Sequence, residues 1–447
     1  MQLKRVVLNN FRCFEHLEID LHPRLTVLVA ENGGGKTAVL DAIAIGLSPV
    51  LRLLSTANQR LNGPGFKNTD FRLQPVLDLW GKPERWITSD YSQVIMETVD
   101  GLKWDHWKPA KSGTEPAEKI GQVELTASIR EILNRLDTLN RGVLPVFAYY
   151  GARRGWIEVP GRLRTSKNNY SYPTSALEGA LEALSDFREM LMWFDAEESS
   201  ELRLNIGRAE EDFDRSPLLQ QVRAAIVLLL HGRYQNPHFT EKHKFVVEEE
   251  KTSTLLQASQ LSQGYQSMLA LGMDFARRLA LGNSHLHGAH GPHRVPALML
   301  VDEIDLHLHP KWQQQVLDDL FNAFPETQFI VTTHSPQVLT TLGKNNIRML
   351  ACDADGQWTA QKPPISPLGH ESGDALAQVM GAHPRPDCPA ILPDLHKYEQ
   401  LARAGQGDSA EARAIKARLD EAGFEFNPAE TALFEFLARK AAHTPVV

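Results

Sequence analysis

The sequence predicts an α/β fold, because short apolar runs alternate with stretches of helical spacing. Three of these runs, at 25–29, 296–301 and 329–333, are each followed by polar residues suited to chemistry. Continuous apolar runs of this length are typical of strands that are buried on both faces, as in a parallel sheet. The polar residues after them would then gather at the carboxyl edge of that sheet.

A glycine-rich loop follows the first of these strands and precedes a helical pattern, and it reads Ala30-Glu31-Asn32-Gly33-Gly34-Gly35-Lys36-Thr37. Glycines let backbone N–H groups approach phosphate oxygens at a helix N-terminus, where the helix dipole also favours anions. Lys36 would reach the β- and γ-phosphates of a nucleotide, and the Thr37 hydroxyl would hold Mg²⁺. The residues expected to bind the nucleotide here are Asn32, Gly33, Gly34, Gly35, Lys36, Thr37 and Ala38.

An N-terminal part of the α/β unit is expected over 1–155, with an antiparallel lobe beside the loop. Residues 85–107 alternate in polarity around Asp100-Gly101, a dipeptide typical of a hairpin turn. A turn between two earlier strands carries Arg12 close to where phosphates would sit. Arg12 is therefore a candidate for nucleotide binding, and a solvated turn residue is an equal alternative.

A mainly helical insertion is expected over 156–242, because 175–194 and 217–234 have helical apolar spacing. Its first segment, 156–174, mixes basic, polar and aromatic residues. This mixture suits either contact with a nucleic-acid backbone or a mobile solvated loop, and the loop is the simpler interpretation.

The α/β unit is expected to resume over 243–366. Ser262 and Gly264 stand at the start of a predicted helix, in Leu261-Ser262-Gln263-Gly264, where they would form a second anion site. Asp302, at the end of the second apolar strand, would approach Mg²⁺, and Glu303 would face the attacking water. His334, at the tip of the third strand, would lie near the γ-phosphate.

Two segments outside these motifs have simpler interpretations. The chain over 367–447 is helical and charged in pattern, with a capping box at 427–430, and we expect it to contact a partner or another copy. A histidine-rich loop over 285–293 suits a flexible surface loop better than a metal site, because nothing fixes the geometry of the ligands.

The composition is typical of a globular protein, with 42% hydrophobic and 23% charged residues among 447. No apolar run approaches the roughly 20 residues of a membrane span, and the N-terminus lacks a signal-peptide layout. The three cysteines are scattered, which agrees with a reducing compartment. We therefore expect a cytoplasmic protein with no membrane partner. The net charge of −8 argues against a surface that coats nucleic acid by bulk electrostatics, but it does not exclude a local basic groove.

Four motifs occur in one order: the glycine loop, Leu-Ser-x-Gly, the strand ending in Asp-Glu and the strand-tip histidine. In this order they resemble the ABC-type ATPase heads of the RecF, SMC and OLD group. The resemblance implies a P-loop NTPase fold, in which an ABC-type ATPase head carries an antiparallel β lobe, a helical insertion and a helical C-terminal tail. It also implies ATP and Mg²⁺ as cofactors and an ATPase whose catalytic residues are Glu303, His334 and Lys36.

In that group two heads dimerise head to tail and enclose ATP, so the resemblance implies that Ser262 and Gly264 act in trans on the γ-phosphate. Two residues depart from the group's pattern. Ala30 replaces the first loop glycine, and Gln263 stands where transporters usually have glycine. No residue is assigned to the group's Mg²⁺-sensing glutamine.

The whole layout, including the strand end Tyr149-Tyr150-Gly151-x-Arg153, looks most like the ATPase subunit of Septu-type and retron-associated anti-phage systems. Such ATPases act with a separately encoded HNH-type nuclease. The resemblance therefore implies an ATPase that controls this nuclease, with DNA or retron nucleic acid as a further candidate partner. OLD-type relatives carry a fused Toprim nuclease, which Asp353-Ala354-Asp355 mimics, but a hairpin turn explains these residues better.

Two other functions stay open at this point. The heads could clamp DNA in repair or recombination, as RecF- and SMC-like ATPases do. Alternatively, the chain could be a non-catalytic scaffold gated by nucleotide. Steeply salt-dependent DNA binding without a partner would favour the first, and a turnover that Lys36→Ala abolishes would exclude the second.

Overall fold

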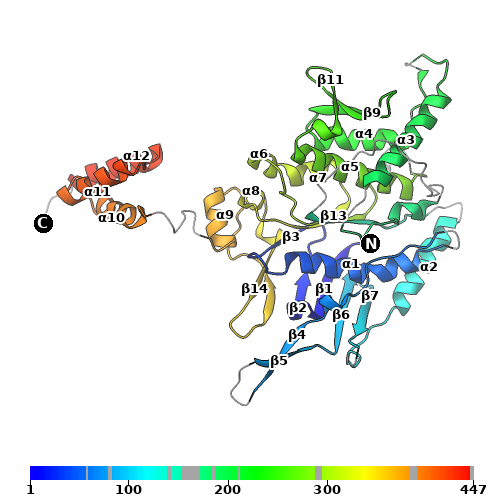
Figure 1. The fold of residues 1–447 in the computed structure, drawn as a ribbon, viewed down its shortest axis with the longest axis horizontal. Helices are drawn as coiled ribbons and strands as arrows, with labels where there is room; N and C mark the ends of the chain where they lie inside the picture. The colour runs from blue at the N-terminus through cyan, green and yellow to red at the C-terminus, as the bar shows by residue number, and fades with distance from the viewer. Residues whose placement is uncertain are drawn as a thin grey trace. The chain divides into compact units, whose positions relative to one another are not determined.

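The computed structural model describes residues 1–56, 59–78, 83–111, 113–137, 142–152, 172–183, 187–209, 212–286, 294–382 and 390–442. The chain divides into two compact units, residues 1–380 and 381–447 (Figure 1). Each unit is described by itself, and the elements below belong to the first unit unless the second is named.

A six-stranded sheet organises the first unit, in the order β15-β14-β3-β13-β12-β8. Neighbouring strands run parallel except for the hairpin pair of β14 and β15. The strands are β3 (Leu25–Val29), β8 (Val146–Tyr150), β12 (Ala297–Val301), β13 (Thr327–Thr332), β14 (Ile347–Cys352) and β15 (Trp358–Gln361). Every residue of β3, β8, β12 and β13 is buried. The predicted α/β fold with a buried parallel sheet is therefore confirmed.

Helices cover both faces of this sheet (Figure 1). α1 (Lys36–Leu53) shares a hydrophobic core with Leu300 of β12. α5 (Gln263–Gly282) shares the other core with the next residue of the same strand, Val301. Since successive side chains of a strand point to opposite faces, α1 and α5 pack on opposite sides of the sheet.

An antiparallel lobe packs against α1, where the Trp104 indole N–H donates to the Gly46 carbonyl. It contains a four-stranded sheet in the order β2-β1-β6-β7 and a two-stranded ribbon. The strands of the sheet are β1 (Leu3–Phe11), β2 (Phe14–Asp20), β6 (Tyr91–Thr98) and β7 (Lys103–Pro109), and those of the ribbon are β4 (Leu73–Leu77) and β5 (Pro83–Thr88). Gly101, with a φ of 87°, forms the predicted hairpin turn between β6 and β7.

The region that follows β8 is helical in part and also contains a small sheet. Its helices are a 3₁₀ turn, η3 (Pro173–Leu177), followed by α3 (Phe187–Leu204) and α4 (Pro217–Leu229). The helix expected to continue to residue 234 ends earlier, because His231 and Gly232 adopt positive φ values of 54° and 67°. An antiparallel sheet of β9 (Tyr234–Phe239), β10 (Phe245–Glu249) and β11 (Thr254–Gln257) follows.

The remaining helices of the first unit are α2 (Val123–Asp137), α6 (Pro310–Gln313), α7 (Val316–Ala323), α8 (Pro336–Leu339) and α9 (Ser372–Val379). The helical region expected from residue 367 begins with α9. This helix packs within the first unit, because Ala375 and Val379 lie in the core of that unit. Of the helices described, none combines the length and apolar character needed to cross a membrane.

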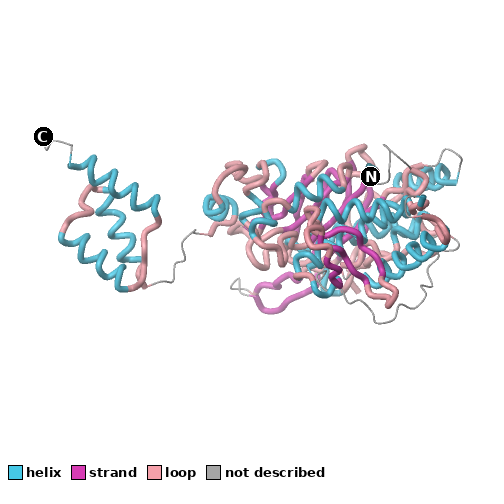
Figure 2. The backbone as a smooth tube through the Cα atoms, turned by 90° about the horizontal axis from the view of Figure 1, so that it is seen from above, coloured by secondary structure: helices cyan, strands magenta, loops and turns pink. Residues whose placement is uncertain are grey.

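The second unit contains only helices as regular structure in its described part (Figure 2). They are α10 (Leu392–Arg403), α11 (Ala410–Glu421) and α12 (Pro428–Ala442). Leu395, Ile415 and Leu419 form their common core. The predicted capping box is confirmed, since the Glu430 N–H donates to Asn427 Oδ1 at 2.8 Å and the Asn427 N–H donates back to the Glu430 carboxylate.

Candidate nucleotide site

The loop between β3 and α1 has a conformation that only glycines adopt easily. Gly33 and Gly35 each have a φ of 80°, a left-handed conformation that other residues avoid. A Cβ at Gly34 would lie 2.5 Å from the Ala30 Cβ, so a larger residue would force the loop to shift. The Lys36 ammonium donates to the Ala30 carbonyl at 2.9 Å. The chain therefore holds this loop over the N-terminus of α1 by its own contacts.

The Lys36 side chain lies in a buried, acidic environment, with 7% of the residue exposed. Burial lowers the pKa of its ammonium, and the carboxylates of Asp302, Glu303 and Asp305 oppose that shift. A bound phosphate would add negative charge beside the ammonium and favour its charged form further.

Thr37 and Asp302, the predicted Mg²⁺ ligands, are in direct contact. The Thr37 hydroxyl donates to Asp302 Oδ2 at 2.8 Å. The other oxygen, Oδ1, accepts a hydrogen bond of 2.6 Å from the Thr332 hydroxyl. Mg²⁺ prefers such oxygen ligands and usually binds through one or two protein groups, with waters and substrate phosphates completing its shell. The pair therefore fits a Mg²⁺ ion that is bound together with nucleotide phosphates.

Glu303 leaves the strand in a strained backbone conformation, with a φ of 49°. Its N–H donates to the Thr332 hydroxyl at 2.7 Å, and the next N–H, of Ile304, donates to the Thr332 carbonyl at 2.9 Å. Positive φ is rare for residues other than glycine, and such strain persists where surrounding contacts hold it, often at catalytic positions. The half-buried Glu303 is therefore fixed directly beside Asp302.

His334 lies at the same edge of the sheet, immediately after β13. Its N–H donates to Asp305 Oδ1 at 3.3 Å, and the Thr333 hydroxyl donates to the same oxygen at 2.5 Å. Its side chain is exposed. Ser335 then caps α8, accepting a hydrogen bond from the Val338 N–H at 3.2 Å. Asp305 thus holds the backbone of the strand tip and leaves the imidazole at the surface.

Arg12 is engaged by two carboxylates of its own chain. Its guanidinium lies 2.8 Å from Asp41 and 2.9 Å from Asp70. Asp41 belongs to α1, about one helical turn after Thr37. Neither interpretation of Arg12 from the sequence included these partners. A phosphate would have to compete with Asp41 for the guanidinium.

Ser262 and Gly264 stand at the N-terminus of α5, away from these contacts. Ser262 is the exposed N-cap residue, and its side chain makes no capping hydrogen bond. Gly264 is buried, and a Cβ there would lie 2.7 Å from the His307 carbonyl oxygen. No hydrogen bond between described residues joins Ser262 to the glycine loop. The structure therefore brings Lys36, Thr37, Asp302 and Glu303 together, and Ser262 shares no hydrogen bond with them in the described part of the chain.

Several side chains that support the site were not predicted from the sequence, and they are Thr332, Asp305 and Asp41. The pairing of β12 with β13 explains the position of Thr332. Val301 lies opposite Val331, so the residues that follow them, Asp302 and Thr332, meet. Two threonines after an apolar strand are a weak signal by themselves. The order of the strands in the sheet, which the sequence does not state, makes them informative.

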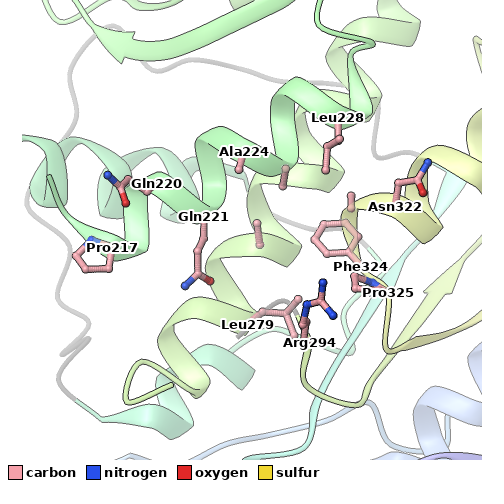
Figure 3. Close-up of a pocket in the computed structure, with 13 residues that line it drawn as sticks. Pro217, Gln220, Gln221, Ala224, Leu228, Leu279, Arg294, Asn322, Phe324 and Pro325 are labelled. Atoms are coloured by element: carbon pink, nitrogen blue, oxygen red, sulfur yellow. The ribbon is translucent and has the colours of Figure 1, made fainter. Parts of the chain in front are cut away.

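A separate cavity of about 510 Å³ lies between α4, α5 and the end of α7 (Figure 3). Leu228, Leu279 and Phe324 contribute apolar lining, and Gln221 and Arg294 add polar groups. None of the predicted nucleotide-binding or catalytic residues lines it. The candidate site and this cavity are therefore distinct features of the first unit.

Two predicted segments lie largely outside the described residues. Of the basic segment 156–174 only 172–174 are described, and of the histidine-rich loop only His285 and Leu286. Within the part of the chain that is described, no group of three or more His, Cys, Asp or Glu side chains could hold a metal ion. A Mg²⁺ ion at Thr37 and Asp302 would therefore need oxygens from nucleotide and water.

Comparison with known proteins gives relatives that span nearly the whole chain. "Retron Vc95 probable ATPase" from Vibrio cholerae serotype O1 biovar El Tor is 25% identical over 465 residues, covering 93% of this chain and 86% of that protein. "Retron Ec83 probable ATPase" from Escherichia coli is 27% identical over 491 residues, with coverage of 97% and 86%. "Septu protein PtuA" from Bacillus mycoides (strain KBAB4) is 40% identical over 138 residues, covering 31% of this chain and 18% of that protein.

Among solved structures, an SMC head bound to the C-winged helix domain of ScpA aligns with a TM-score of 0.43 at 14% identity, covering 81% of this chain and 98% of that one. A family model described as "AAA domain, putative AbiEii toxin, Type IV TA system" matches residues 25–340. That match runs from β3 through the glycine loop, α5 and the Asp302–Glu303 strand end to α8. The chain therefore belongs to this AAA-domain family, and it is an ATPase.

Proposed function

We propose that this ATPase closes head to tail as a dimer around ATP, and that closure controls a separately encoded HNH-type nuclease in anti-phage defence. The observation that carries the dimer is the exposed and uncapped Ser262 at the N-terminus of α5. Since α5 and α1 pack on opposite faces of the sheet, a second copy supplies Ser262 and Gly264 to the γ-phosphate. Higher oligomers would be assembled from such dimers.

In this proposal each residue of the site has a defined role. The backbone N–H groups of the loop and Lys36 bind the β- and γ-phosphates. Thr37 and Asp302 hold Mg²⁺, which neutralises phosphate charge when it is bound. Glu303 orients the attacking water and accepts its proton, and His334 contacts the γ-phosphate. Hydrolysis then removes the γ-phosphate that joins the two chains, and the dimer opens.

The role in defence is supported by similarity over almost the whole chain. The two retron-associated relatives align over 93% and 97% of it, and both are named as probable ATPases. The relative named as a Septu protein is more similar, at 40% identity, over a shorter stretch. The HNH-type nuclease partner follows from the resemblance of the motif layout to Septu-type and retron-associated systems.

The second unit offers a surface for such a partner. Leu433 and Phe436 on α12 are 45% and 61% exposed, whereas Phe434 between them packs against Tyr398. Exposed apolar side chains on one side of a helix are typical of contact surfaces when they form a contiguous patch. These residues support a role of the helical unit in binding the nuclease or another copy.

A DNA-clamping role in repair or recombination is the second candidate. Short stretches of the chain resemble two proteins of that kind. They are a yeast structural maintenance of chromosomes protein 6, at 53% identity over 45 residues, and a Lactococcus lactis RecF named for DNA replication and repair, at 46% over 43 residues. Each stretch covers 10% of this chain. DNA affinity that falls steeply with salt and needs no partner protein would favour this role.

The nuclease proposal is tested with the ATPase purified together with any HNH protein that is encoded beside it. We expect DNA cleavage to respond to nucleotide. Glu303→Gln retains ATP and Lys36→Ala does not bind it, so we expect the first variant to stay in the closed state and the second in the open state, with opposite effects on cleavage. Lys4→Ala, on the antiparallel sheet, serves as the control and should behave like the natural chain. Cleavage that is identical in Glu303→Gln and Lys36→Ala would contradict control of the nuclease by this ATPase.

A further inference from the structure

Strand β8 carries two adjacent tyrosines that reach helices on opposite faces of the sheet. The Tyr149 hydroxyl donates to Asp41 of α1 at 2.9 Å, and the Tyr150 hydroxyl donates to Asp274 of α5 at 2.9 Å. Both rings are buried. Burial and the neighbouring carboxylate raise the pKa of each tyrosine, so both hydroxyls stay protonated as donors. One strand therefore holds the helix of the glycine loop and the helix that begins at Ser262.

Asp274 is a fully buried carboxylate that its own helix keeps charged. Arg277 donates to Oδ1 at 2.8 Å, and Arg278 donates to Oδ2 at 2.7 Å. Burial alone would raise the pKa of Asp274, but the two arginines and the Tyr150 hydroxyl lower it to about 2. Hydrogen bonds to an ionised acceptor are stronger than neutral ones. The hydrogen bond from the Tyr150 hydroxyl to the Asp274 carboxylate therefore joins β8 strongly to α5.

The same tyrosine is also bonded to the metal-binding strand end. The Asp302 N–H donates to the Tyr150 carbonyl at 2.8 Å. The start of α5 touches the segment that follows, because Gly264 packs against the His307 carbonyl. Gly264 and Asp274 lie about 15 Å apart along the helix axis, at 1.5 Å per residue. α5 thus contacts the segment that begins with Asp302 directly at Gly264, and is linked to it indirectly at Asp274 through Tyr150 of β8.

We infer that Tyr150 and Asp274 are positioning residues that set the N-terminus of α5 according to the state of the Asp302–Glu303 segment in the same chain. This inference rests on the proposed head-to-tail dimer, in which α5 of one chain completes the site of the other. A shift of Asp302 on nucleotide binding moves Tyr150, and the packed helix carries that shift to Ser262. The two ATP sites of a dimer are therefore coupled.

Tyr150→Phe removes the linking hydroxyl and keeps the ring. We expect the kcat for ATP hydrolysis to fall about 10-fold, which is the effect of losing one hydrogen bond to a charged group. We also expect the Hill coefficient for ATP to fall to about 1, while the affinity of the single chain for ATP stays unchanged. Tyr149→Phe is the matched control, because it removes the same group on the opposite face and should leave the Hill coefficient as it is.

Mixing two variants tests whether Tyr150 acts on the partner's site. Lys36→Ala lacks a working loop and keeps its α5, whereas Tyr150→Phe keeps its loop. In a mixed dimer one site combines the intact loop with an α5 that Tyr150 still holds, so ATP hydrolysis should rise above that of either variant alone. It should stay below the natural rate, because the Lys36→Ala chain binds no nucleotide that could set its own α5. A mixture of Lys36→Ala with Ser262→Ala is the positive control and should recover in the same way.

The outcomes separate the inference from the proposal on which it rests. Recovery in the control mixture without recovery in the Tyr150→Phe mixture would overturn the positioning role and leave the dimer standing. No recovery in either mixture would overturn the head-to-tail dimer, and the positioning role with it.

A second measurement does not depend on Tyr150→Phe folding correctly. In Ser262→Ala, which is not expected to close as a dimer, a non-hydrolysable ATP analogue should change the hydrogen exchange of the backbone amides at the start of α5. Exchange at those amides that is unchanged when the analogue fills the site would contradict the inference. Amides of α12 in the second unit provide the internal reference.

Discussion

The N-termini of α1 and α5 both have glycine nearby, and they differ in their surroundings. Both helices are long, with 18 and 20 residues, and both begin beside glycines. The α1 end is enclosed by its own chain, since Lys36 donates to the Ala30 carbonyl and Thr37 to Asp302. The α5 end exposes Ser262, whose side chain makes no capping hydrogen bond. The end of α1 is therefore held by contacts within the chain, as the proposed phosphate and metal site requires, whereas the end of α5 fits the proposed anion site that a second copy would complete.

The largest effect should come from the enclosed end. In the proposed mechanism the Lys36 ammonium neutralises charge on the transferred phosphate, so we expect Lys36→Ala to lose ATP binding and its hydrolysis to fall by about 10³-fold. Binding is measured by equilibrium titration with labelled ATP, and turnover by phosphate release. Lys4→Ala, which removes an exposed lysine, is the control. Retained turnover in Lys36→Ala would show that the glycine loop is not the catalytic site.

Ser262→Ala tests the exposed end and should have the next largest effect. We expect hydrolysis to fall by about 10²-fold, the cost of one donor to the reacting phosphate, while the single chain binds ATP as before. ATP affinity and turnover are measured on the same preparation, so that an effect on hydrolysis is distinguished from an effect on ATP binding. A loss of ATP affinity equal to that in Lys36→Ala would mean that Ser262 acts on its own chain's nucleotide.

Thr332→Val tests whether the Thr332 hydroxyl orients Asp302 and Glu303 beside the N-terminus of α1. The substitution keeps the shape and removes the hydroxyl that bonds to Asp302 and to the Glu303 N–H. Groups that orient metal ligands typically contribute about 10- to 100-fold to metal affinity, so the Mg²⁺ concentration for half-maximal ATPase activity should rise about 10-fold. Thr333→Val, one residue away and bonded to Asp305 instead, should change it less. Equal effects of both variants would contradict a specific role of Thr332.

The smallest effect concerns stability beside the start of α5. His231 lies 3.1 Å from Asp319 and packs against Trp312, which contacts Tyr265 of α5. Burial and then the neighbouring Asp318 raise the pKa of Asp319 to about 7, and burial lowers the pKa of His231. The protonated carboxyl is therefore favoured in the folded state. Its contribution to stability is complete below the ordinary pKa of 3.8 and is lost as the pH rises to about 7.

Asp319→Asn removes this titration and keeps the size of the side chain. The free energy of unfolding of the variant, relative to that of the natural chain, should therefore be higher at about pH 8 than at about pH 5, as measured by urea titration. The expected difference is modest because the side chain is partly exposed. A difference of the opposite sign would show that Asp319 is ionised in the folded protein at low pH.

The parallel core and the enclosed site were largely predictable from the sequence. Buried parallel strands are continuous apolar runs, and the polar residues that end them must meet at one edge. For this reason Lys36, Thr37, Asp302 and Glu303 were expected to lie together, and the structure brings them together. The hairpin turns at Gly101 and at Asp353-Ala354-Asp355 and the capping box at 427–430 were also predicted, and each depends on neighbours in the chain.

Contacts between strands and helices that are distant in sequence were not predictable in the same way. Thr332, Tyr149 and Asp41 acquire their roles only from the order of the strands and from the face on which α1 packs. The engagement of Arg12 by Asp41 and Asp70 belongs to the same class. β9 was missed because His231 and Gly232 end α4 within a stretch whose apolar spacing still looks helical.

The most direct test of the shared site is the mass of Glu303→Gln in solution, measured by light scattering with and without Mg²⁺ and ATP. Loss of a general base slows hydrolysis by about 10²- to 10⁴-fold, so ATP should stay bound and the molar mass should double when nucleotide is added. Adding Ser262→Ala to the same chain should prevent the doubling. A mass that stays constant while ATP is bound at one molecule per chain would contradict the head-to-tail site.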